Sequence, residues 1–179
     1  MKRLPFTDAF VDESIRGRRY LMACVLVAAK DLAPLRVEVE SLVLTGRRVH
    51  FHNESKARRR VLLSEFSEWP ISTVVTVCHR GHGTTEYAAR AQCLGTIVER
   101  IQADGVPHLV LESRQDDRDD HRTIQRTRRS APPLVWDHRA PAEEPLLWIA
   151  DGIAWAAGAG GTWRELIAPI VEGTIELHP

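Results

Sequence analysis

Short apolar runs separated by polar residues predict the elements of this chain. They predict a strand over Thr7–Glu13 that ends in acids, and a longer buried strand over Arg19–Ala28. The turn around Arg16-Gly17 favours an antiparallel hairpin between the two strands. Apolar positions three and four residues apart then predict a helix over residues 31–44.

The middle of the chain alternates between helical and extended patterns. Ser55 or Asn53 can cap the first of these helices, because their side-chain oxygens accept free backbone N–H groups. β-Branched residues dominate the first extended segment, as is typical of strands. The predicted helices cover residues 56–68 and 84–103, and the predicted strands cover Ile71–His79, His108–Glu112 and Leu134–Trp136.

The last third contains a helix, residues 145–157, that is apolar on nearly every side and is therefore enclosed by protein. A short helix over Trp163–Val171 is expected to close the chain, and the charged stretch Ser113–Ser130 is interpreted as an exposed helix or a mobile flap. The order of elements predicts an α/β fold with a mixed sheet, in which an antiparallel opening hairpin is followed by parallel strands, flanked by helices. We expect one domain, 1–179, with a helical insertion at about 30–68.

The charge balance gives no global attraction to polyanions. Lys and Arg number 24, as do Asp and Glu, so contact with nucleic acid needs local patches. The longest apolar run, Tyr20–Ala29, is shorter than the about 20 residues needed to cross a bilayer. Cys24, Cys78 and Cys93 lie in apolar segments and are interpreted as reduced packing residues. A cytoplasmic protein without membrane contact is expected.

Asp151 is the single acidic residue within the apolar helix. An ionised, unpaired carboxylate there would cost several kcal/mol, so the group must be neutral, paired with a cation or bound to a metal. The main rival to metal binding is a buried ion pair with an arginine such as Arg18 or Arg114.

Two further acids end predicted strands. Asp12 ends the first strand and Glu112 ends a later one, and the carboxyl ends of parallel strands share one edge of a sheet. Together with Asp151 they would offer hard oxygen ligands, which suit Mg²⁺ or Mn²⁺. Asp116 or Asp117 remains an alternative to Glu112 as the third ligand.

Two short motifs resemble a bacterial family, domain of unknown function 3800. Phe10-Val11-Asp12-Glu13-Ser14 resembles that family's Asp-Glu-Ser-Gly opening, and 148–154 resembles its closing helix with a leucine-alanine-aspartate motif. The family is thought to resemble the ribonuclease H-like superfamily, which places acids on the first strand, the fourth strand and the last helix. The resemblance implies a ribonuclease H-like fold and a site of Asp12, Glu112 and Asp151. Glu54-Ser55-Lys56 matches a Glu-x-Lys of the family, which implies that Glu54 joins the acids and Lys56 contacts phosphate.

Other charged side chains suggest further contacts. Arg59 lies in a basic run at a predicted helix start, and Arg114 follows Glu112, so both are candidates for binding substrate phosphate. Alternation would place His50, His52 and Glu54 on one face, a pattern that can also hold zinc or iron.

Three hypotheses follow. The leading one is a nuclease or phosphodiesterase that acts on RNA or DNA with one or two Mg²⁺ or Mn²⁺ ions held by Asp12, Glu112 and Asp151, with Glu54 added. The second is a non-catalytic interaction module that buries Asp151 in an ion pair. The third is a metalloenzyme centred on His50 and His52. The oligomeric state stays open.

Overall fold

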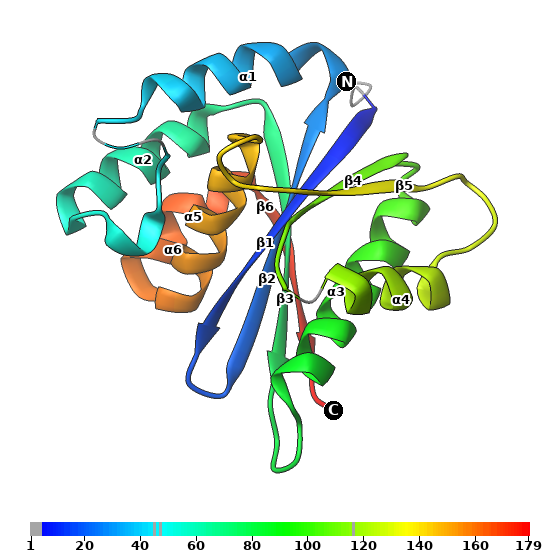
Figure 1. The fold of residues 1–179 in the computed structure, drawn as a ribbon. Coiled ribbons are helices and arrows are strands. Elements are labelled where there is room, and N and C mark those ends of the chain that lie inside the picture. Colours follow the sequence, from blue (N-terminus) through cyan, green and yellow to red (C-terminus); the bar gives the residue numbers. More distant parts are fainter. Residues whose placement is uncertain (1–4, 45, 47, 116) are drawn as a thin grey trace.

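Six strands form one mixed sheet in the computed structural model, which describes residues 5–44, 46, 48–115 and 117–179 (Figure 1). The strand order is β5-β4-β1-β2-β3-β6. β1 and β2 form the antiparallel hairpin, β4 pairs parallel with β1, and β5 pairs parallel with β4, which confirms the predicted mixed sheet. The strands are β1 (Phe6–Arg16), β2 (Arg19–Ala28), β3 (Ile71–His79), β4 (His108–Glu112), β5 (Val135–Arg139) and β6 (Val171–Leu177).

Helices cover both faces of the sheet and separate its core into two clusters (Figure 1). α3 and α4 cover one face, and α1, α2, α5 and α6 cover the other. No helix of the described residues is long and apolar enough to span a membrane. The helices are α1 (Ala29–Ser41), α2 (Lys56–Glu68), α3 (Glu86–Ala103), α4 (Asp117–Thr127), α5 (Leu146–Ala159) and α6 (Gly161–Ile167).

Local signals set several of these bounds. Ser55 caps α2 by accepting the backbone N–H of Arg58 at 3.2 Å, and Thr85 caps α3 by accepting that of Ala88 at 3.1 Å. The charged stretch after β4 is largely helical, because Thr123 and Ile124 on one side of α4 are buried against the α3 layer. The sequence left open an exposed helix or a mobile flap for this stretch, and most of its described residues form the helix α4.

The end of the chain differs from its prediction. The expected helix over Trp163–Val171 ends at Ile167, a 3₁₀ turn with Pro169 follows, and residues 171–177 form β6 against β3. Proline cannot continue the hydrogen bonding of a helix, and the open edge of β3 offers a ladder of backbone groups to the segment that follows. This strand was missed because Gly173 and two glutamates weaken its apolar alternation.

α5 lies in the middle of one helical layer, where a glycine permits close packing. An added Cβ at Gly152 would lie 2.9 Å from Cε2 of Phe66 and 3.0 Å from Cδ2 of Phe51. Both rings belong to the buried core, so neither can move away freely. Gly152 is the residue after Asp151, and its missing side chain is what allows Phe51 to approach that part of the helix.

We predict that Gly152→Ala lowers the free energy of unfolding by about 1–3 kcal/mol, because the methyl group overpacks the core. Denaturant titration measures the change. Gly173→Ala is the matched control, since an added Cβ there meets nothing within 4 Å. Equal losses in both variants, or none in Gly152→Ala, would contradict the packing argument.

Candidate metal centre

Three of the predicted acids line one pocket. β1 and β4 are parallel neighbours in which Val11 pairs with Leu111, so the next residues, Asp12 and Glu112, lie side by side. α5 packs across β1 and brings Asp151 to the same edge. The cavity has a volume of about 250 Å³ and is lined by Asp12, Glu13, Arg48, Val49, His50, Glu112, Arg114, Pro141, Leu147, Trp148 and Asp151.

Asp12 is the most enclosed of these acids, with 7% of its surface exposed. Its Oδ1 accepts the backbone N–H of Glu13 at 2.8 Å. Burial raises the pKa of Asp12 well above its ordinary value, and the negative charges of Glu112 and Asp151 raise it further. Arg90 opposes this shift without cancelling it. The local excess of negative charge is therefore stabilised by a proton or by an added cation.

Asp151 is held by a backbone group rather than by an arginine. Its Oδ2 accepts the N–H of Phe51 at 2.9 Å and lies 3.7 Å from Nδ1 of His50. Burial raises the pKa of Asp151, against the lowering effects of the Phe51 N–H, His50 and Arg48. Within the described part of the chain no arginine forms an ion pair with Asp151: Arg114 pairs with Glu13 instead, and Arg18 is exposed in the hairpin turn.

Arg59 supports the turn that contacts Asp151. Its Nε donates to the carbonyl oxygen of Phe51 at 2.9 Å, and its Nη2 donates to that of His52. The guanidinium also lies over the ring of Trp155 in α5, 4.4 Å from the centroid. Predicted as a phosphate contact, Arg59 is thus committed to internal bonds that fix the Phe51 N–H beside Asp151.

Glu54 and Lys56 lie outside this pocket. Residues 51–53 form one 3₁₀ turn, so the alternation that would align His50, His52 and Glu54 does not hold. The turn directs Glu54 toward Arg58, 4.0 Å away on the first turn of α2. Lys56 lies at a separate hollow on the outer side of α2, with Arg60 and Val61. Among the histidines of the described residues, His50 alone lines the pocket.

A buried arginine that the sequence analysis missed lies behind the pocket. The carboxylate of Glu13 contacts Arg114 and also Nη1 of Arg90, which lies 2.7 Å away. Arg90 donates to both oxygens of Asp120 at 2.7 Å and to the hydroxyl of Tyr20 at 3.1 Å. Its position in the sequence could have indicated this role. Arg90 lies on the apolar face of its helix, and a charged side chain on a buried face needs a partner of opposite charge.

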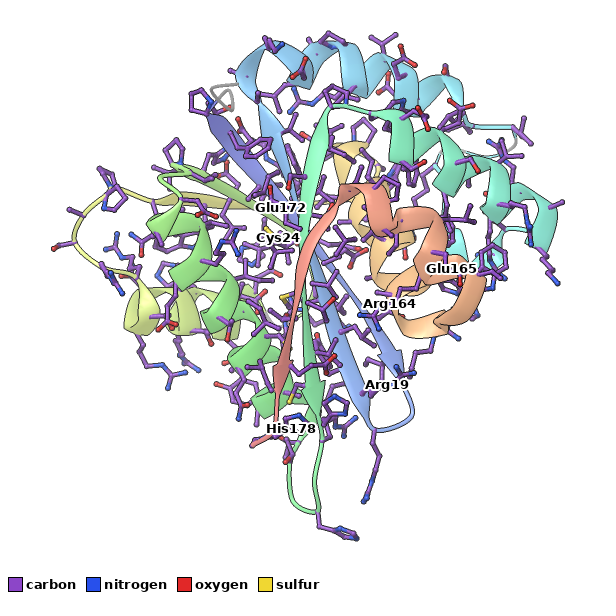
Figure 2. The ribbon with its side chains drawn as sticks, turned by 180° about the vertical axis from the view of Figure 1, so that it is seen from behind. Arg19, Cys24, Arg164, Glu165, Glu172 and His178 are labelled. Carbon is purple, nitrogen blue, oxygen red and sulfur yellow. The ribbon has the colours of Figure 1, made fainter. Side chains whose placement is uncertain are left out.

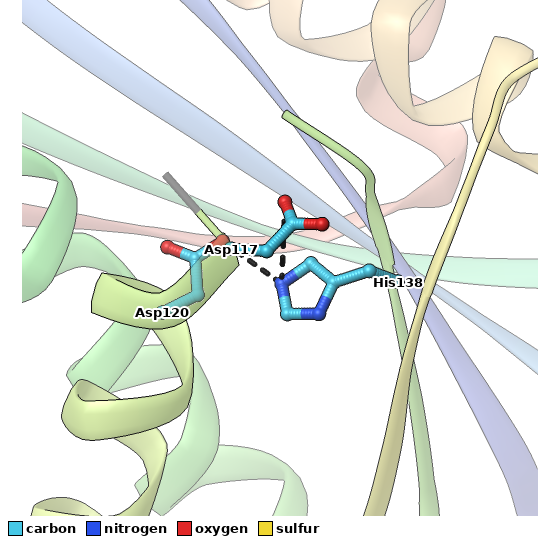
Figure 3. A group of neighbouring side chains, drawn as sticks. All are labelled: Asp117, Asp120 and His138. Atoms are coloured by element: carbon cyan, nitrogen blue, oxygen red, sulfur yellow. Dashed lines mark hydrogen bonds and ion pairs between the residues drawn. The ribbon is translucent and has the colours of Figure 1, made fainter. Parts of the chain in front are cut away.

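Asp120, which binds Arg90, belongs to a second group of possible ligands with Asp117 and His138. Figure 3 shows the three side chains of this group. One atom each from Asp117, Asp120 and His138 lies within 4.8 Å of the others. Burial alone raises the pKa of Asp120, but its hydrogen bonds with Arg90 and His138 outweigh burial and lower it. Since Arg90 already neutralises this carboxylate, a cation would have to displace the guanidinium. Asp117 belongs to this group rather than to the first pocket, and Asp116 lies outside the described residues.

The first pocket has the donor set that suits a hard divalent cation. Its three carboxylates come from two strands and a helix, and burial together with the charges of Glu112 and Asp151 disfavours the ionised form of Asp12. Among the described residues, only the group around His138 meets the 4.8 Å spacing, so the acids of the first pocket are more widely spread. Such a spacing fits Mg²⁺ or Mn²⁺ that retains waters, or two ions, better than one dry ion.

The sequence matches no protein-family model, and no curated protein is significantly similar to it. Solved structures are similar in fold. The chain aligns with Bst-RNase HIII, solved in complex with Mn²⁺, at a TM-score of 0.52 and 12% identity, covering 88% of this chain and 53% of that one. It aligns with ribonuclease H2 from Pyrococcus horikoshii OT3 at a TM-score of 0.53 and 14% identity, covering 85% and 72%.

This chain thus spans about half the length of Bst-RNase HIII (53%), and at such low identity the likeness is one of fold. It confirms the ribonuclease H-like level of the predicted resemblance, while membership of the domain of unknown function 3800 family stays a prediction. The sheet, its helical layers and these two neighbours together place the chain in the ribonuclease H-like fold.

Proposed function

We propose that this protein is a divalent-metal-dependent nuclease that cleaves a phosphodiester bond of RNA or DNA. The observation that carries the proposal is the meeting of Asp12, Glu112 and Asp151 in one pocket, where the buried Asp12 has no arginine in hydrogen-bonding contact among the described residues. A purely structural role would not require Asp12 and Asp151 to lie where burial and the neighbouring negative charges raise the pKa of each. The ribonuclease names of the two fold neighbours support the same reaction class.

In this proposal the three acids bind the metal, and two arginines that line the pocket, Arg48 and Arg114, bind the phosphate. Asp12, Glu112 and Asp151 would hold Mg²⁺ or Mn²⁺, which when bound lowers the pKa of water and neutralises charge developing on phosphate. Arg114 and Arg48 line the same cavity and can contact phosphate oxygens. Arg90 binds Glu13, and Glu13 in turn binds Arg114. Because this ion pair already restricts the Arg114 side chain, Arg114 loses less conformational entropy when it binds phosphate.

The non-catalytic alternative rests on a buried ion pair of Asp151, and the described residues contain no arginine that makes it. The non-catalytic alternative requires no metal ion in this pocket. Metal binding therefore separates the two proposals most directly.

We predict that Mn²⁺ or Mg²⁺ raises the melting temperature by about 5–10 °C once its concentration is about 100 times the Kd, because only the folded state gathers the acids. Differential scanning fluorimetry with and without EDTA measures the shift. The rise should be lost in Asp151→Asn and kept in Glu54→Gln, the matched control outside the pocket. A shift that is equal in both variants would point to binding elsewhere.

We predict that the metal-free protein loses stability as the pH rises from the ordinary Asp value of 3.8 through the raised pKa of Asp12. In that window the folded state binds more protons than the unfolded state, so the free energy of unfolding falls with pH. Asp12→Asn removes this charge and should be more stable than the wild type at pH 7 in EDTA. Urea titrations across pH test the sign, and a less stable Asp12→Asn would refute it.

We predict that the pure protein cleaves labelled RNA, DNA or hybrid strands in Mn²⁺, and that Asp12→Asn, Glu112→Gln and Asp151→Asn each lower the rate by at least about 100-fold. The loss arises because each change removes one charged ligand. Gel analysis of cleavage products measures the rates, with Glu54→Gln expected at the wild-type level. Wild-type cleavage by Asp151→Asn would remove the assignment.

A further inference from the structure

In α4, two of the aspartates form internal hydrogen bonds, whereas the arginines lie on the exposed side of the helix. Asp117 turns back to accept hydrogen bonds from the Ser113 hydroxyl and the Arg114 N–H, and Asp120 points into the core toward Arg90. Three arginines four residues apart lie on the exposed side of the helix: Arg118, Arg122 and Arg126. A sequence of nearly balanced charge therefore presents a positive face to solvent.

Internal bonding does not account for these arginines. In the part of the chain that the structure describes, Arg118 and Arg126 form no ion pair, and Arg122 reaches Asp119 at 3.0 Å while 70% of its side chain stays exposed. Arg118 also lies in the first turn of α4, where the helix dipole disfavours a positive charge. Local stability therefore gives little reason for a positive residue at this position.

The positive face begins beside the proposed metal centre. Arg114 lines both the pocket of Asp12 and a hollow of about 120 Å³ bordered by α3 and α4. Arg118 follows four residues later in the first turn of α4, and Arg118 to Arg126 spans about 12 Å at 1.5 Å per residue. Successive phosphates of one DNA strand are separated by about 3.4 Å along the axis of the duplex. A length of about 12 Å along that axis therefore corresponds to three or four phosphates.

Resting on the proposed nuclease function, we propose that Arg118, Arg122 and Arg126 bind the phosphate backbone of the nucleic acid whose scissile phosphate enters the pocket. Arginine suits this role because its guanidinium stays charged and bonds phosphate oxygens bidentately. The formal net charge of the chain is zero, so such a local face must supply the attraction. Contacts of this kind recognise the backbone without reading sequence.

The test measures binding without cleavage. Affinities of the wild type for a fluorescein-labelled RNA–DNA hybrid are measured by anisotropy in EDTA over a series of salt concentrations. Arg118→Gln/Arg126→Gln is compared with Lys30→Gln/Arg164→Gln, which removes the same charge elsewhere. Lys30 lies in the first turn of α1, and Arg164 lies on α6, in the helical layer opposite α4 (Figure 2). Circular dichroism confirms that both variants are folded.

The proposal requires weaker binding by the α4 variant, with a slope of log K against log salt that is shallower by about 2, and a wild-type slope in the control. Equal slopes in all three proteins would overturn it. Tighter binding of polyglutamate than of the hybrid would also overturn it, because the face would then serve an acidic protein. Since EDTA prevents metal-dependent hydrolysis, a changed slope without any cleavage in Mn²⁺ would refute the nuclease function alone.

Discussion

Repulsion between the buried Asp12 and two partly buried carboxylates is the constraint on which this structure depends. Asp12 is almost fully enclosed, and its neighbours Glu112 and Asp151 add negative charge that raises its pKa. A fold tolerates such an arrangement only when the rest of the molecule supplies the lost free energy, and functional sites are where proteins retain this cost. The two helical layers and their apolar cores provide that support.

β1 connects the site to both layers because successive side chains point to opposite faces of a sheet. Asp12 points to the α5 side, where it meets Asp151, and Glu13 points to the α3 side, where Arg90 binds it. These two neighbouring acids of β1 therefore differ in their partners. Asp12 lacks an arginine at hydrogen-bonding distance among the described residues and stays available to a cation, whereas Glu13 is neutralised and serves to hold Arg114 at the pocket edge.

Supporting residues determine how the helix-borne acid is presented. Phe51 donates its N–H to Asp151, Arg59 binds the carbonyl oxygen of Phe51, and Gly152 leaves space for the Phe51 ring. The Phe51 N–H that contacts Asp151 lies 100 residues earlier in the chain, so the position of Asp151 reflects tertiary packing rather than helix geometry alone. Arg59 illustrates the point, since a basic residue at a helix start supports the turn by donating to the carbonyl oxygens of Phe51 and His52.

The sequence by itself determined the elements with strong periodicity and the acids at their ends. β3, β4 and α2 have the predicted bounds, because β-branched runs, apolar spacing and the Ser55 cap act locally. Asp12 and Glu112 were identifiable because each ends a predicted strand at a shared edge of the sheet, and Asp151 because a carboxylate inside an apolar helix is costly without a partner. Tertiary structure alone decided the pairing of β6, the partners of Glu13 and the turn that directs Glu54 away from the pocket. Those outcomes depend on open strand edges and on charges brought together from distant segments, and no local pattern encodes such contacts.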